Sequence, residues 1–360
     1  MPQDPNPDPQ NDLKDKIDSY LQTVHALVGF MHFFRFDQSQ MSVNADVTAF
    51  QGWRLEPSDK KKINNNGQEV KFVTPDLGIV YEGNEGVLVE AKGSFPRNTE
   101  YWKKPFEQLM SYDDDLNGWP TASGHVNNHD IVLLVNQERC SQVVKYYKGI
   151  SEKEIKIERP FIIVQFNRSD GRRNYYYFQK QLGDLSNKGV NARLDDGEKL
   201  PMDLFVSYYA KIKLYDSEPP IPYLIQLIWE NVVLQHVLDN PQFSYLRKRQ
   251  KLEVILKLND ILNELSSGYT FHSLNTDTQG RKPQIPQKAW IVKACDCLVK
   301  YKEAEWIAGK DTIKIYFQKY DSILDHFIAC CAEEEERNRQ LNLFDTAQIN
   351  NTEIEDQNLQ

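Results

Sequence analysis

Residues 74–95 read TPDLGIVYEGNEGVLVEAKGSF, the most informative stretch of the chain. Two runs rich in β-branched and apolar residues flank EGNEG, whose glycines and asparagine form a strong turn signal. The pattern predicts two antiparallel strands joined by a tight loop. If Tyr81 pairs with Glu85 across the turn, the register places Asp76 opposite Glu90, with neighbouring Cβ atoms.

Two carboxylates and one ammonium would then share a small surface. Because side chains alternate along a strand, Glu90 and Lys92 lie on the same face. Asp76 and Glu90 repel each other unless a cation lies between them, and oxygen-only ligands select a hard ion such as Mg²⁺ or Mn²⁺. That ion can activate water, and Lys92 can orient the water or stabilise charge on phosphorus. We therefore predict phosphodiester hydrolysis, and the alternative is a salt-bridged surface hairpin.

These residues resemble a known family. Pro75-Asp76, thirteen intervening residues and Glu90-Ala91-Lys92 are similar to the motif of the PD-(D/E)XK nuclease superfamily, which has the restriction-endonuclease-like fold. The resemblance implies an α/β protein with a mixed sheet flanked by helices. It also implies that Asp76 and Glu90 hold the metal ion, that the Ala91 carbonyl is a further ligand, and that Lys92 positions the attacking water.

The segment that follows extends the resemblance over roughly residues 10–180. YWKKPFEQLMSYDDDL predicts an amphipathic helix near residues 102–116, with Gln108 and Tyr112 on one face. Gln108-x-x-x-Tyr112 is similar to the QxxxY motif of RecB-like nucleases and of type I restriction motor subunits. In those families the helix follows the Glu-x-Lys strand and lines the active site. The resemblance implies that both residues support the site or contact DNA.

A first helix is expected over about residues 11–34, and here the sequence departs from the pattern. Many superfamily members carry an acidic residue or a histidine on this helix as an additional metal ligand, but the segment contains no Glu. We take His25 as the candidate ligand and Asp18 as a second, because Asp12 and Asp15 stand near the exposed start. The alternative is a packed or solvated His25.

The chain divides into five predicted regions. These are a disordered leader at residues 1–10, the nuclease domain at 11–184, a polar linker at 185–218, a mainly helical domain at 219–332 and an acidic disordered tail at 333–360. Within the nuclease domain, strands are expected in HDIVLLVN, PFIIVQF and NYYYFQK, the last two as a hairpin. The apolar run 131–135 predicts a strand buried on both faces, and helices are expected on both sides of the sheet.

The C-terminal half carries apolar residues at helical spacing in residues 221–238, 246–268 and 287–304. A short apolar run, a Gly-Lys-Asp turn and a β-rich run follow in residues 305–317 and predict a small hairpin. Helices followed by a hairpin are typical of a winged-helix module, which would place its third helix in a DNA major groove. A helical subdomain that packs on the nuclease or dimerises is the alternative.

Charge and cysteine content restrict the function classes. A net charge of −9 and a pI near 5.4 argue against a protein coated in nucleic acid, because non-specific DNA affinity comes from Lys and Arg. Local basic groups are the exceptions: Lys60-Lys61-Lys62, Arg168 with Arg172-Arg173, and Arg247-Lys248-Arg249 followed by Lys251. We take Arg247, Lys248 and Arg249 as candidate DNA contacts. The 5 cysteines show no CxxC spacing, which favours reduced thiols in a cytoplasmic protein. No apolar run reaches the roughly 18 residues of a membrane span.

The tail contains a second recognisable motif. Gln340-Leu341-Asn342-Leu343-Phe344 resembles the pentapeptide by which bacterial proteins bind the sliding clamp of replication. Leu343 and Phe344 would fill an apolar pocket of the clamp, while Gln340 would hydrogen-bond at its rim. The alternative is a helix end whose Leu and Phe dock back on the domain.

Together these patterns predict a metal-dependent DNA endonuclease of bacterial restriction, defence or repair type. Because two cuts on a duplex need two sites, a homodimer is compatible with this function. One alternative is a RecB-like exonuclease or a nuclease subunit that works with a separate helicase or methyltransferase, since the chain has no Walker A motif. Another is a non-catalytic DNA-binding or clamp-associated adaptor with a nuclease fold.

Overall fold

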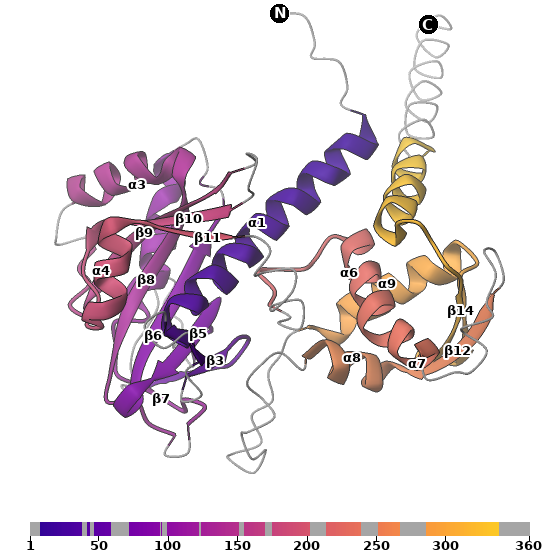
Figure 1. Cartoon of the computed structure of the whole chain (residues 1–360), viewed down its shortest axis with the longest axis horizontal. Coiled ribbons are helices and arrows are strands. Elements are labelled where there is room, and N and C mark those ends of the chain that lie inside the picture. The colour runs from indigo at the N-terminus through magenta and orange to yellow at the C-terminus, as the bar shows by residue number, and fades with distance from the viewer. Residues whose placement is uncertain are drawn as a thin grey trace, which may run out of the picture. The chain divides into compact units, whose positions relative to one another are not determined.

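The chain forms two compact units in the computed structural model (Figure 1). The sheet unit comprises residues 20–218 and 266–286, and the C-terminal unit comprises residues 1–19, 219–265 and 287–360. The structure describes residues 8–37, 42–43, 47–58, 72–93, 95, 99–121, 124–150, 155–169, 175–201, 214–238, 251–266 and 286–337.

The sheet unit alternates strands and helices. Its elements are α1 (Pro9–Arg35), which belongs to this unit from Tyr20 onward, β1 (Phe36–Asp37), β2 (Ser42–Val43), β3 (Thr48–Phe50), β4 (Glu56–Pro57), β5 (Leu77–Tyr81), β6 (Glu85–Lys92), α2 (Lys103–Met110), β7 (Leu116–Asn117), β8 (Asn128–Asn136), α3 (Gln137–Gly149), β9 (Phe161–Ser169), β10 (Tyr175–Gly183), α4 (Lys188–Asp196) and β11 (Glu198–Pro201). Short 3₁₀ turns at Glu82–Asn84 and Thr99–Trp102 precede β6 and α2.

Seven strands form one mixed sheet in the order β11-β10-β9-β8-β6-β5-β3. Strand β8 runs parallel to both β6 and β9, and the other neighbouring strands are antiparallel. Helix α1 lies over one face, where the ring of Phe33 packs edge-on against Phe178 at 5.5 Å between centroids and the ring of Phe34 lies tilted against Tyr81 at 5.1 Å. Helices α2 and α3 cover the other face. The predicted mixed α/β architecture with helices on both sides is therefore confirmed.

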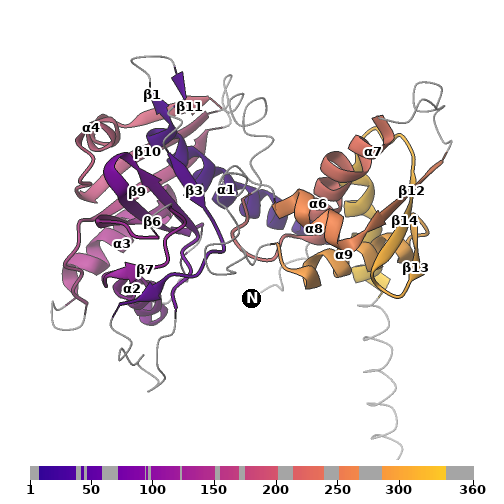
Figure 2. The same cartoon turned by 90° about the horizontal axis from the view of Figure 1, so that it is seen from below.

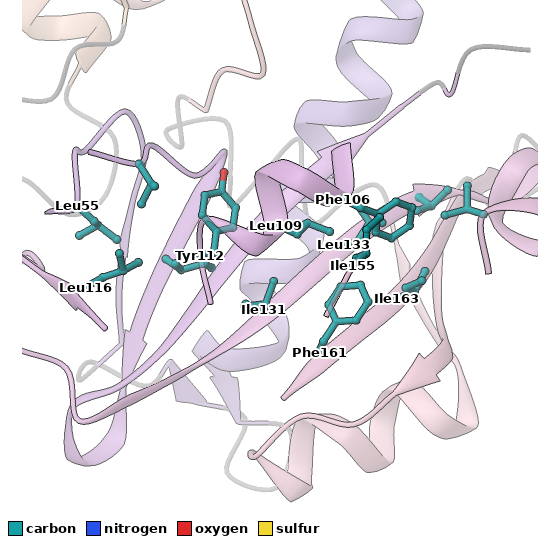
Figure 3. Close-up of a cluster of buried hydrophobic side chains, with 14 of the residues drawn as sticks. Leu55, Phe106, Leu109, Tyr112, Leu116, Ile131, Leu133, Ile155, Phe161 and Ile163 are labelled. Carbon is teal, nitrogen blue, oxygen red and sulfur yellow. The ribbon is translucent and has the colours of Figure 1, made fainter. Parts of the chain in front are cut away.

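The main core lies between this sheet and helices α2 and α3 (Figure 3). It joins Phe106 and Leu109 of α2 to Ile131 and Leu133 of β8 and to Ile163 of β9. All side chains of the 131–135 run are fully buried, which confirms the prediction of a central strand covered on both faces. The core fixes β8 against β6 and so holds the motif strand in place.

Two predicted boundaries in α1 and in the segment after β10 were wrong. Helix α1 begins at Pro9, inside the region taken as a leader, because Asp8 accepts a hydrogen bond from the Gln10 amide at 3.1 Å and proline suits the first helical position. Residues 188–201, taken as linker, form α4 and the edge strand β11. The Asn187 side chain caps α4, and antiparallel pairing with β10 then absorbs β11 into the sheet.

The C-terminal unit contains helices on one side of a small sheet (Figure 2). Its elements are α6 (Ile221–Ile228), a π-helical turn (Trp229–Val233), α7 (Leu234–Leu238), β12 (Leu252–Lys257), α8 (Leu258–Ser266), α9 (Lys288–Lys300), β13 (Ala304–Ala308), β14 (Thr312–Phe317) and a helix over residues 323–337. The sheet order is β12-β14-β13, with antiparallel pairs, so the predicted hairpin of residues 305–317 is confirmed.

The helix predicted over residues 246–268 is in part a strand. Residues 252–257 pair with β14, and burial alternates along them, with Val254 and Leu256 inside and Ile255 60% exposed. The run LEVILK supplies apolar residues that satisfy helical spacing, yet its alternating burial follows the strand period of two.

Several predicted features lie outside the described residues. These are the basic group Arg247, Lys248 and Arg249 and the clamp-like motif Gln340, Leu341, Leu343 and Phe344. In the part of the chain that the structure describes, no helix is both long and apolar enough to span a bilayer.

Candidate active site

The motif hairpin has the predicted register. Tyr81 pairs with Glu85 and Leu77 pairs with Val89, so continuing the register by one residue sets Asp76 opposite Glu90. The turn is short because Asn84 adopts a left-handed backbone with φ of 62°, which asparagine tolerates better than most residues. The two carboxylates are thus brought together by strand pairing alone.

Asp76 is tied directly to the motif strand. Its Oδ2 accepts a hydrogen bond of 2.9 Å from the amide of Ala91, the residue between Glu90 and Lys92. Burial and the negative charge of Glu90 raise the pKa of Asp76 well above its ordinary value, and the positive charge of Lys92 opposes that rise. Two carboxyl groups therefore share a site in which water screens them poorly.

Lys92 and Glu90 form an ion pair within the site. The Lys92 ammonium lies 2.5 Å from Glu90 Oε1, and the Glu90 side chain is 1% exposed while that of Lys92 is 28% exposed. Burial alone would lower the pKa of Lys92, but the charges of Glu90 and Asp76 outweigh it and raise that pKa. Lys92 is therefore a cation with one side open to solvent.

Tyr112 and Gln108 complete this network from the next element. The Tyr112 hydroxyl donates to Glu90 Oε2 at 2.7 Å, and Gln108 Nε2 donates to the Tyr112 oxygen at 3.0 Å. In Figure 3 the ring of Tyr112 stands at the edge of the core, with its oxygen pointing away from the cluster. Burial and the charge of Glu90 raise the pKa of Tyr112 well above its ordinary value, so the hydroxyl keeps its proton and donates.

The position of Tyr112 is fixed by groups outside the site. Helix α2 ends at Met110, earlier than predicted. Tyr112 lies in the turn that follows, and its main-chain amide donates a hydrogen bond to the Leu109 carbonyl at 3.0 Å. The buried ring of His129 bonds the Tyr112 carbonyl through Nε2 at 2.7 Å. At the next residue, the Asp113 carboxylate accepts a hydrogen bond from the main-chain amide of Arg159 at 2.8 Å. These anchors give the Tyr112 ring one orientation.

The structure brings His25 to a different place. Its Nδ1 lies 3.1 Å from the Tyr176 hydroxyl on β10, and burial together with the charge of Arg168 lowers the pKa of His25 to about 4. Strand β10 is separated from β6 by β8 and β9. Side-chain alternation through the paired strands puts Tyr176 on the face opposite to Glu90. His25 therefore packs on the far face of the sheet, and the interpretation as a metal ligand beside Asp76 and Glu90 finds no support in this geometry.

The donor chemistry of the pair fits a small hard cation. Both Asp76 and Glu90 offer carboxylate oxygens. Burial and the negative charge of Glu90 raise the pKa of Asp76, and a bound cation would oppose that rise by stabilising the ionised carboxylates. Within the described ranges, His, Cys, Asp and Glu side chains form no group of three or more that could hold a metal ion. A bound ion would therefore depend on this pair together with main-chain, water or substrate oxygens.

Sequence reasoning missed two residues here. The charge of Asp216 acts on both Asp76 and Lys92, and the side chain of Gln51 hydrogen-bonds the Asp76 carbonyl at 2.7 Å. Asp216 stands in YDSEPP, within the segment taken as linker, and Gln51 follows a strand of only three residues. Neither local sequence carries a motif that could have indicated a role.

Comparisons with protein-family models, with curated proteins and with solved structures give no match for this chain.

Proposed function

We propose that this chain is a metal-dependent DNA endonuclease of the PD-(D/E)XK type that acts in bacterial restriction, defence or repair. The observation that carries the proposal is the contact between Lys92 and Glu90 beside Asp76. The Asp76 carboxylate accepts a hydrogen bond from the amide of Ala91, the residue between Glu90 and Lys92. Glu90 and Lys92 on the central strand β6, with Asp76 just before the neighbouring strand β5, are groups that can serve metal-dependent phosphodiester hydrolysis.

Asp76 and Glu90 would hold Mg²⁺ or Mn²⁺, with the Ala91 carbonyl as a further ligand. When bound, such an ion polarises a phosphoryl oxygen and lowers the pKa of a water molecule. The acid pair supplies negative charge in a partly desolvated place, where its attraction for a divalent cation is stronger than in bulk water.

The chain's own groups have distinct roles around that pair. Lys92, held charged by its neighbours, donates hydrogen bonds to the attacking water or to a phosphoryl oxygen that gains negative charge. Tyr112 holds one oxygen of Glu90 and so fixes the direction of the other. Gln108 positions the Tyr112 hydroxyl. Partners of this kind, one step outside the ligands, hold the donor oxygens in a fixed orientation.

The position of the motif in the sheet supports the restriction-endonuclease-like fold. Strand β6 lies inside the sheet, between antiparallel β5 and parallel β8, and α2 connects β6 to β8. The helix with Gln108 is the first α-helix after the Glu-x-Lys strand, as in the QxxxY families, and Tyr112 lies just past its end.

The C-terminal unit supports a second component, a winged-helix module that would bind DNA. From α6 to β14 its elements run helix, strand, helix, helix, strand, strand, with α6, the π-helical turn and α7 as one continuous helix, and a further helix follows over residues 323–337. The last strand, β14, lies between β12 and β13. Helix α9 would then enter the major groove. Its exposed Lys288 and Lys293 would face phosphates, so charge reversal at Lys293 should lower DNA affinity and reduce its salt dependence while metal affinity stays unchanged.

The test of the proposed activity is cleavage of supercoiled plasmid, linear duplex and single-stranded DNA in Mg²⁺, Mn²⁺ or EDTA. Wild type is compared with Asp76→Ala and Lys92→Ala. The proposal expects metal-dependent cutting that both substitutions abolish, with discrete fragments from the duplex. Progressive shortening from the ends would favour an exonuclease instead.

Absence of cutting on all three substrates, with DNA binding unchanged in both variants, would refute the simple enzyme. That result would favour the adaptor, or a nuclease subunit that requires a helicase or methyltransferase partner. The clamp-like motif at residues 340–344 stays a prediction, and a binding measurement with purified clamp and a Leu343→Ala, Phe344→Ala double variant tests it.

A further inference from the structure

Gln51 connects two segments that are distant in sequence. It follows β3 directly, its side chain is 5% exposed, and its amide nitrogen donates to the carbonyl oxygens of Asp76, at 2.7 Å, and of Tyr215. Its amide oxygen accepts the Tyr215 N–H at 2.7 Å. Both hydrogens and the oxygen of the side chain are therefore used in bonds to the main chain of the two segments.

This clamp brings a further carboxylate to the site. Asp216 follows Tyr215 and is partly buried. Because Gln51 joins the Asp76 carbonyl to the N–H and carbonyl of Tyr215, the next residue, Asp216, is held beside the Asp76 end of the site. Interactions between the charge of Asp216 and those of Asp76, Glu90 and Lys92 agree with this placement.

We propose that Gln51 is a positioning residue that locks residues 214–217 against Asp76, so that Asp216 provides a third negative charge at the cation site. The inference rests on the proposed function, because it concerns how the same site binds its metal ion. The three carboxylates are not grouped as ligands of one ion among the described residues. Asp216 therefore acts from outside the ligand pair, by attraction for the cation and by accepting hydrogen bonds from water bound to it.

A buried amide suits this role better than a charged side chain. It hydrogen-bonds one N–H and two C=O groups of the main chain, and pairing such buried groups favours the folded state. Gln51→Glu keeps the volume and the acceptor for the Tyr215 N–H, but it sets a carboxylate against two carbonyl oxygens. The substitution should therefore release residues 214–217 from Asp76.

The experiment is titration calorimetry with Mn²⁺ alone on the full chain. Gln51→Glu and Asp216→Asn should each lower the Mn²⁺ affinity by about 10-fold or more, as is usual for partners outside the ligand set. Asp216→Glu should recover most of the loss, and the double variant should lose no more than either single one. Glu158→Gln, which removes an exposed carboxylate of the same unit that pairs with Lys156, is the matched control and should leave the affinity unchanged.

Thermal unfolding of each variant separates positioning from general structural support. The inference would be overturned if Gln51→Glu unfolds at a lower temperature than wild type while Gln51→Glu and Asp216→Asn both keep the wild-type Mn²⁺ affinity. If Gln51→Glu does not fold, Asp216→Asn and its recovery by Asp216→Glu decide the question.

Asp76→Asn keeps the two proposals distinct. If it abolishes Mn²⁺ binding while the Asp216 variants bind like wild type, this inference fails and the proposed function stands. If wild type binds no Mn²⁺, or if Asp76→Asn binds as wild type does, the proposed function fails and the inference fails with it.

Discussion

Removing one oxygen atom from the site should measurably destabilise the sheet unit. Tyr112→Phe keeps the ring in the core and deletes the hydroxyl that donates to Glu90 Oε2 at 2.7 Å. Glu90 is 1% exposed, so water cannot readily replace the lost donor. The substitution also removes the acceptor of Gln108 Nε2.

The expected loss of stability follows from the hydrogen bond that Tyr112→Phe removes. A hydrogen bond to a charged group contributes about 1.5–3 kcal/mol, and burial of the acceptor argues for the full value. For a unit of this size each kcal/mol corresponds to about 2–4 °C in Tm, so we expect a decrease of about 3–12 °C. Urea denaturation at neutral pH without divalent metal should give the same free-energy difference.

Tyr147→Phe is the matched control. Its ring stacks on Phe106 in the same core, and its hydroxyl is not part of the Glu90 network. We expect this variant to unfold close to wild type. Equal Tm decreases in the two variants would refute the reasoning, because they would show that the Glu90 bond contributes no more than an ordinary hydroxyl in this core.

Burial and the charge of Glu90 raise the pKa of Asp76 in the folded state, so the folded protein binds more protons than the unfolded chain and loses stability as the pH rises. Without metal, Asp76→Asn should therefore have a larger free energy of unfolding than wild type at neutral pH. In urea denaturation at a series of pH values, this difference between the variants should shrink toward pH 4. An advantage that grows as the pH falls would contradict this sign. Gly78→Ala should lower the free energy of unfolding by about 1–3 kcal/mol or more in the same assay, because the added Cβ would lie 1.9 Å from the Phe50 ring. A variant as stable as wild type would mean that the ring moves freely. Cys140 should resist iodoacetamide in the native protein until it unfolds, since burial raises the pKa of its thiol to about 12, and rapid native labelling would disprove the burial.

The motif hairpin could be predicted from sequence because local rules determine it. A turn signal and two apolar runs fixed the register of Tyr81 with Glu85, and that register alone set Asp76 opposite Glu90. The contact of Glu90 with Lys92 follows from alternation along a single strand. The helix that carries Gln108 was also predictable, although α2 ends before Tyr112.

Other features depend on tertiary contacts that no local pattern reveals. The polar residues 188–201 were taken as linker, yet capping by Asn187 and pairing with β10 make them a helix and a strand. Residues 252–257 fit helical spacing, but pairing with β14 makes them a strand. Gln51 and Asp216 reach the site through contacts that span 25 or more residues, as in the bonds of Gln51 to Asp76 and Tyr215.

The roles proposed for the acid pair and for Lys92 can be separated by measuring the cleavage rate and the Mn²⁺ affinity of Lys92→Met on one preparation. We expect the affinity to equal or exceed that of wild type, because loss of the ammonium frees Glu90 Oε1 and removes a positive charge. At saturating Mn²⁺ we expect plasmid cleavage to slow by about 100-fold or more, because the group that stabilises the developing charge is gone. A variant that cuts at the wild-type rate would contradict the role of Lys92, and one that loses the metal together with the cleavage would contradict the division of roles between the acid pair and the lysine.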